Sequence, residues 1–209
     1  MSDPVFKIDW QTLLSRLKEI FYFLLEYFKN PITGMRQLPD WNWFTIILCQ
    51  GFLSSICGLL SGIVGQSVSG ALLGFLFFPI TTIVTNFLVS GFFYYTFLFF
   101  YRRNVDFRKL YTINVFANLP FIVLTIISFL LRPIVLVGLA VTGVLLLVGF
   151  VENFKLPKQS IARFLLILYL IYMVMWVVNT LQLSKEENSF HNMATPESLD
   201  VLEKELKGK

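Results

Sequence analysis

The sequence predicts an all-α polytopic membrane protein, a five-transmembrane-helix bundle with an N-terminal amphipathic surface helix. Apolar residues make up 56% of the 209 residues and charged residues only 14%, against about 25% charged in an ordinary globular chain. No charged residue lies between Asp40 and Arg102, and that stretch is long enough for two crossings of about 20 residues each. These observations exclude a water-soluble enzyme, a disordered chain and a disulfide-stapled secreted domain.

Residues 1–40 are expected to form a cytoplasmic segment that contains an amphipathic helix over residues 9–29. Asp9 is a candidate N-cap, and Asn30-Pro31 ends the helix. Apolar residues recur at the spacing of one helical face, at Trp10, Leu13, Leu14, Leu17, Ile20, Phe21, Leu24, Leu25 and Phe28. Such a helix fits the membrane surface or a groove on the bundle, and docking onto a protein partner is the alternative.

The membrane domain is predicted to cover residues 41–184. Apolar runs of about 20 residues match the hydrocarbon thickness as helices, and they place five spans at residues 43–63, 80–101, 110–131, 133–151 and 164–184. The second run begins at Ala71 and is too long for one straight crossing. Pro79 is therefore expected to kink or start a helix, with residues 71–78 as a kinked extension or a short interfacial segment.

The remaining elements are a tight turn and a tail. Arg132-Pro133 is expected to form a very tight hairpin between the third and fourth spans. Residues 185–209 form a hydrophilic tail, in which Thr195-Pro196-Glu197 predicts a short helix over residues 196–207.

The distribution of lysine and arginine predicts the orientation. Up to the last span, twelve of these residues lie in the segment before the first span and in the loops after the second and fourth spans, whereas the intervening turns hold only Arg132. Basic residues gather on the cytoplasmic side of a membrane protein. The N-terminus is therefore expected in the cytoplasm and the C-terminus outside.

No catalytic constellation is recognisable, so no catalytic, cofactor-binding or metal-binding residue is predicted. His191 is the sole histidine, and neither phosphate-loop nor dinucleotide-binding glycine motifs occur. The spans contain no internal ionisable group of the kind that ion-coupled carriers use. The basic residues flank apolar runs instead of clustering on a soluble face, and we expect no nucleic-acid partner.

Uncharged polar residues do occur inside the spans. Thr81, Thr82 and Thr85 lead to Asn86, and Asn114 and Asn118 lie four residues apart on one face of the third span. Such groups in lipid usually hydrogen-bond between helices. The alternative is a polar path or small-ligand site lined by Asn86, Asn114 and Asn118. Small residues at intervals of four, as in Ser54-Gly58-Gly62, predict close packing of the first two spans.

The order of several short motifs resembles the Yip family, the Rab-interacting membrane proteins and their bacterial relatives. The motifs cover about residues 20–183 and are Asn30-Pro31, Phe77-Phe78-Pro79-Ile80, Phe92-Phe93-Tyr94-Tyr95, Tyr101-Arg102-Arg103 and Ala117-Asn118-Leu119-Pro120. The resemblance implies a five-span fold and a membrane role without a defined reaction. The acidic trafficking motif of the eukaryotic members is not recognisable before the first span, which favours a bacterial member in the inner membrane.

The resulting functional hypothesis is a non-enzymatic membrane organiser or partner-binding scaffold. Its expected partners are membrane lipids and either a membrane protein or a second copy of the chain. Aromatic and basic residues are typical contact anchors, and the expected docking residues are Trp10, Phe21, Phe28, Arg108 and Lys109. The alternative is a transporter or channel for a neutral or lipidic substrate, favoured by the intramembrane asparagines.

Overall fold

The computed structural model describes residues 10–128, 130–131 and 133–193. These residues form seven helices: α1 (Trp10–Lys29), α2 (Pro31–Arg36), α3 (Trp43–Val64), α4 (Val68–Phe99), α5 (Phe107–Leu124), α6 (Ile134–Phe154) and α7 (Lys158–Met193). The predicted cap at Asp9, the tail helix over 196–207 and Arg132 of the predicted hairpin lie outside the described residues. The chain divides into two compact units, one ending at Leu165 and the other beginning at Leu166.

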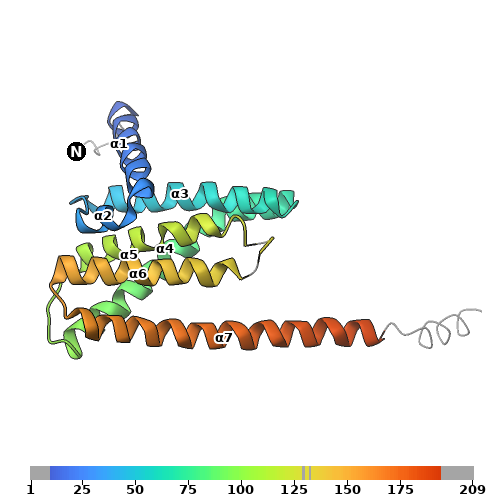
Figure 1. The fold of residues 1–209 in the computed structure, drawn as a ribbon. Coiled ribbons are helices and arrows are strands. Elements are labelled where there is room, and N and C mark those ends of the chain that lie inside the picture. The colour runs from blue at the N-terminus through green and yellow to red at the C-terminus, as the bar shows by residue number, and fades with distance from the viewer. Residues whose placement is uncertain (1–9, 129, 132, 194–209) are drawn as a thin grey trace, which may run out of the picture. The chain divides into compact units, whose positions relative to one another are not determined.

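Four helices are long and apolar enough to cross a membrane. They are α3, α4, α6 and the Lys158–Gln182 part of α7. The all-α polytopic fold class is therefore confirmed. In the first unit, α3 to α6 run alongside one another in alternating directions (Figure 1). The second unit consists, in its described part, of the remainder of α7.

The third predicted span, residues 110–131, differs from the structure. Its helix α5 begins earlier, at Phe107, and stops at Leu124 after 18 residues. Beyond it the N–H groups of Ile126 and Ile127 donate to carbonyls three residues back, and the Thr125 hydroxyl bonds to the Ile122 carbonyl. These bonds replace the α-helical pattern with a turn. By length and composition α5 is not among the candidate spans, so a fifth crossing stays a prediction.

Two further boundaries correct the sequence analysis. No helix starts at Pro79, because α4 is one continuous helix of 32 residues with that proline inside, so residues 71–78 extend the span and are not a separate interfacial segment. A helix of this length measures about 48 Å, which a bilayer accommodates by tilt. The last helix begins at Lys158 instead of residue 164 and continues to Met193, through the start of the predicted tail. Pro157 allows this start, because its carbonyl accepts the N–H of Ile161.

Close packing of α3 against α4 depends on glycine. A Cβ atom added at Gly58 would lie 2.3 Å from the Gly74 carbonyl oxygen, and one added at Gly74 would lie 2.4 Å from the Gly58 carbonyl oxygen. One turn further, a Cβ at Gly62 would lie 2.2 Å from the Ala71 nitrogen. The two backbones thus touch directly, which confirms the packing that the small-residue spacing predicts.

Replacing Gly58 by alanine should force α3 and α4 apart. Overpacking of this kind costs about 1–3 kcal/mol, so Gly58→Ala should lower the thermal unfolding temperature of the purified protein in detergent. The matched control is Gly143→Ala, because a Cβ there meets no atom within 4 Å. Equal unfolding temperatures for the two variants would contradict the close contact.

Candidate functional site

Helix α1 is held on the bundle by aromatic side chains, which we call the aromatic anchor: Phe23, Tyr27, Trp41 and Phe116. The ring of Phe23 lies 5.1 Å from those of both Trp41 and Phe116, and Tyr27 lies 5.6 Å from Phe116. The buried Tyr27 hydroxyl donates to the Phe116 carbonyl oxygen at 2.7 Å. Burial raises the pKa of Tyr27 above its usual range, so the phenol keeps the proton that this bond requires.

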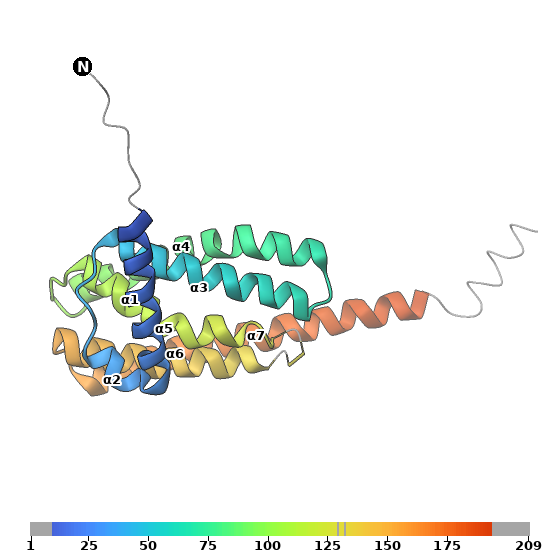
Figure 2. The same cartoon turned by 90° about the horizontal axis from the view of Figure 1, so that it is seen from above.

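The short helix α2 continues the contact with the bundle. Pro31 occupies its first turn, where the missing N–H costs nothing. The Asn153 amide on α6 donates to the Met35 carbonyl at 3.1 Å, and Arg36 lies 3.4 Å from the Glu152 carboxylate. Both interactions tie α2 to the last turn of α6. Helices α1 and α2 therefore cover one end of the bundle (Figure 2).

Only part of the apolar surface of α1 is used for this docking. Ile20, Leu24 and Tyr27 are buried. A second set, Phe21, Leu25 and Phe28, stays exposed by 55%, 47% and 41%. We call this second set the exposed flank. The side chain of Trp10, predicted to belong with Phe21 and Phe28, lies outside the described side chains.

The predicted docking residues Arg108 and Lys109 line a separate hollow at the start of α5. Its volume is about 370 Å³, and its lining is Leu38, Pro39, Asp40, Asp106, Arg108, Lys109 and Thr112. Arg108 pairs with the exposed carboxylate of Asp40 at 2.7 Å, while Lys109 is exposed. Among the described residues, no hydrogen bond, ion pair or ring contact joins this hollow to the exposed flank. The structure therefore separates the predicted docking residues into two groups.

The structure brings the predicted intramembrane asparagines together. The Asn114 amide donates to the Asn86 backbone carbonyl at 3.0 Å, and the Asn118 amide donates to the Asn86 side-chain oxygen at 2.6 Å. Asn114 also reaches Ser90 Oγ at 3.3 Å. Ser90 was missed by the sequence analysis, although it follows Asn86 by one helical turn. The Asn114 side-chain oxygen is buried and has no partner among the described residues.

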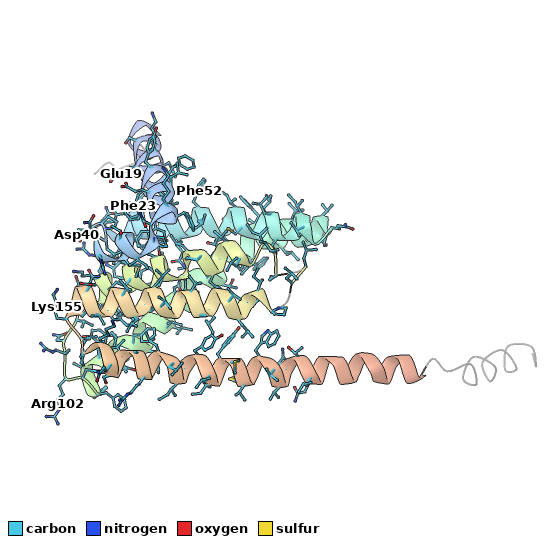
Figure 3. All side chains as sticks on the ribbon, viewed as in Figure 1. Glu19, Phe23, Asp40, Phe52, Arg102 and Lys155 are labelled. Carbon is cyan, nitrogen blue, oxygen red and sulfur yellow. The ribbon has the colours of Figure 1, made fainter. Side chains whose placement is uncertain are left out.

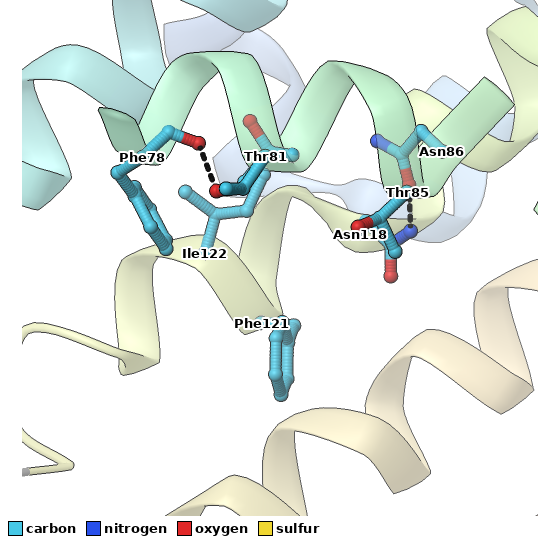
Figure 4. Close-up of a pocket in the computed structure, with 8 residues that line it drawn as sticks. Phe78, Thr81, Thr85, Asn86, Asn118, Phe121 and Ile122 are labelled. Carbon is cyan, nitrogen blue, oxygen red and sulfur yellow. Dashed lines mark hydrogen bonds between the residues drawn. The ribbon is translucent and has the colours of Figure 1, made fainter. Parts of the chain in front are cut away.

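Beside this cluster α4 and α5 enclose a groove of about 250 Å³, lined by Phe78, Thr81, Thr82, Thr85, Asn86, Asn118, Phe121 and Ile122 (Figure 4). The Thr81 and Thr82 hydroxyls donate to the carbonyls of Phe78 and Pro79. Their remaining lone pairs, and the Thr85 hydroxyl, give the groove a polar wall. Its other surfaces are aromatic and aliphatic.

A second buried polar contact was also missed. The Tyr111 hydroxyl donates to the Gln50 side-chain oxygen at 2.7 Å, and the Ser54 hydroxyl bonds to the Gln50 carbonyl. The contact joins α5 to α3, and Gln50 is fully buried. The available signal was a glutamine inside the otherwise apolar first span.

The fold and these contacts define an integral membrane protein whose interior holds hydrogen-bonded polar side chains. Within the described residues, no group of three His, Cys, Asp or Glu side chains could hold a metal ion. The Yip1 domain family matches the chain over residues 25–179, and the chain therefore belongs to that family. The match confirms the resemblance found in the sequence. No curated protein and no solved structure gives a match.

The docking of α1 can be tested at the hydroxyl of Tyr27. Removing a buried hydrogen-bond donor costs about 1–3 kcal/mol, so Tyr27→Phe should lower the unfolding temperature and speed proteolysis within α1. Tyr22→Phe is the matched control, because Tyr22 is 63% exposed on the same helix. If both variants behave like the parent protein, the hydrogen bond does not hold α1 in place.

Proposed function

We propose that this Yip1-domain protein is a non-enzymatic membrane organiser that binds a membrane-protein partner at the end of the bundle covered by α1 and α2. The family consists generally of non-enzymatic membrane proteins. The polar groups of the interior support this assignment, because Asn86, Asn114 and Gln50 bond to helix backbones and neighbouring side chains across α3, α4 and α5.

We further propose that this end faces the cytoplasm, that the C-terminus lies outside and that the membrane is a bacterial inner membrane. The start of α3, the end of α4, the start of α5 and the end of α6 meet at this end (Figure 1). Arg102 and Lys155 also lie there, and both are exposed (Figure 3). A basic rim on one end is the pattern that sets orientation in a membrane.

The observation that carries the partner proposal is the hollow at the start of α5. It presents exposed charges of both signs, Asp40 and Lys109, on a backbone held by Pro39 and by the Asp106 N-cap, whose carboxylate accepts the Arg108 N–H at 2.9 Å. Asp40 is already paired with Arg108, whereas Lys109 has no ion-pair partner among the described residues. A hollow with exposed charges of both signs therefore fits a cytoplasmic segment of another membrane protein that carries an acidic group opposite Lys109.

The partner proposal predicts that Lys109→Glu weakens the complex. The glutamate repels an acidic group of the partner that the lysine attracts, so association should fall by at least about tenfold. The measurement is the yield of cross-linked complex of defined mass, purified from native membranes. Arg102→Glu is the control, because it makes the same charge change at an exposed position on the same end.

A loss confined to Lys109→Glu supports docking at the hollow. An equal loss in both variants indicates a general charge effect and contradicts the site. Full yield in both places the docking surface elsewhere, and a parent protein that forms no complex contradicts the scaffold role itself.

A second candidate function, a transporter or channel for a neutral or lipidic substrate, is favoured by the groove between α4 and α5. If the groove carries a lipid head group past the membrane interior, the double variant Thr85→Val and Asn118→Leu should lose that activity while α4 and α5 stay packed. Fluorescently labelled phosphatidylethanolamine in vesicles is the probe, and its movement between leaflets is the measurement. A parent protein that gives no acceleration over empty vesicles contradicts this candidate.

A further inference from the structure

Helix α1 has three faces that differ in chemistry: a face docked on the bundle, the exposed flank and a polar face. Successive residues of a helix are about 100° apart. Each residue of the exposed flank follows a docked residue by one position: Phe21 follows Ile20, Leu25 follows Leu24 and Phe28 follows Tyr27. The exposed flank is therefore turned about 100° away from the bundle, on one side of the helix only.

The opposite side of α1 is polar. Glu19 precedes the docked Ile20 and Glu26 precedes the docked Tyr27, and both are exposed. Two positions separate Glu19 from Phe21, so their directions differ by about 200°. Figure 3 shows Glu19 at the free side of α1, away from the span residue Phe52. The helix thus has a face for protein, an apolar face on one side of it and an acidic face on the other.

The position of α1 along the bundle places its apolar face at the level where the hydrocarbon layer of the membrane begins. Helix α3 begins at Trp43 and has 22 residues, about 33 Å, which matches a hydrocarbon layer of about 30 Å. Its start therefore lies at one boundary of that layer. The aromatic anchor fixes α1 beside Trp41, at the level of this boundary. Both views show α1 running at a steep angle to α3 instead of along it (Figures 1 and 2).

We propose that the exposed flank of α1 is inserted into the acyl-chain boundary of the cytoplasmic leaflet. A helix parallel to a membrane at this level needs an apolar face toward the lipid and a polar face toward water, and α1 has both. Lys18 and Lys29 are exposed and, by helical spacing, lie between the two faces, where they meet the anionic head groups. In this arrangement Phe21 and Phe28 contact lipid, and the protein partner keeps the hollow at Lys109.

By inserting α1 into one leaflet, the proposed membrane organiser acts directly on the lipid of that leaflet. Helix α1 has 20 residues, so it is about 30 Å long and about 10 Å wide. It displaces lipid only in the leaflet that it enters, because the spans cross both leaflets and α1 does not. The inference rests on the proposed role as an organiser and names the lipid surface as a direct ligand of this chain.

Spin labels report the environment of each face of α1. Single cysteines are introduced at positions 21, 25 and 28 and, as controls, at positions 19 and 26, in a protein whose buried Cys49 and Cys57 are replaced by alanine. The protein is reconstituted in vesicles of phosphatidylethanolamine and phosphatidylglycerol. Collisions of the label with oxygen, which concentrates in lipid, are compared with collisions with a water-soluble nickel complex.

Labels at 21, 25 and 28 should favour oxygen several-fold over nickel, and labels at 19 and 26 should show the reverse. A nickel preference at 21, 25 and 28 would place the flank in water and overturn the proposal. Shielding from both reagents would indicate cover by protein, such as a second copy, and would overturn it as well. Because the vesicles contain no partner, this result is independent of the cross-linking experiment on Lys109.

A second measurement keeps both native cysteines. Phe21→Trp and Glu19→Trp are compared with the parent protein in vesicles that contain lipids brominated along the acyl chain, which quench tryptophan fluorescence on contact. Additional quenching in Phe21→Trp alone supports insertion. Equal quenching of the two variants contradicts a one-sided contact of α1 with lipid.

Discussion

Polar groups inside a bilayer must find partners within the protein, and in this chain that constraint acts through α5. Its residues bond to three other helices of the first unit: Tyr111 bonds to Gln50 on α3, Asn114 bonds to Asn86 on α4, and the Phe116 carbonyl accepts the Tyr27 hydroxyl from α1. A helix with this many polar contacts is poorly suited to lipid. Its contacts with α1, α3 and α4 supply partners for most of these groups, whereas the buried Asn114 side-chain oxygen and the buried Gln50 amide nitrogen have none among the described residues.

The same helix sets the spacing of its neighbours. A Cβ at Gly149 on α6 would lie 2.6 Å from Ile113 Cγ2 and 2.7 Å from Met35 Cε, so α6 approaches both α5 and α2 at that point. Glycine contacts also join α3 to α4, and both of these helices bond to α5, α3 through Gln50 and α4 through Asn86. Within the first unit, the aromatic anchor extends this packing to α1, which makes the surface helix a fixed part of the fold.

The polar groups inside the first unit and the charged groups at its surface make different kinds of contact. The interior amides make short hydrogen bonds between helices, whereas the charged groups at the α1 end are exposed, as in the pair of Arg108 with Asp40. Exposed ion pairs contribute little to stability, so the fold does not depend on those charges. The exposed flank of α1 belongs to neither set of groups. Its side chains are apolar, and the proposal places them at the boundary of the hydrocarbon layer.

The sequence by itself determined the membrane class, the helical content, the family and the identity of the intramembrane asparagines, because apolar composition and residue spacing are local properties of the chain. It left open whether residues 71–78 extend α4 through Pro79, and it did not reveal where α5 ends or that Gln50, Ser90 and Tyr111 take part in the polar contacts. Those outcomes depend on which helix lies opposite. The division of the apolar residues of α1 into a docked face and an exposed flank was likewise decided by tertiary structure, since residues outside α1, among them Trp41 and Phe116, determine which ones are covered.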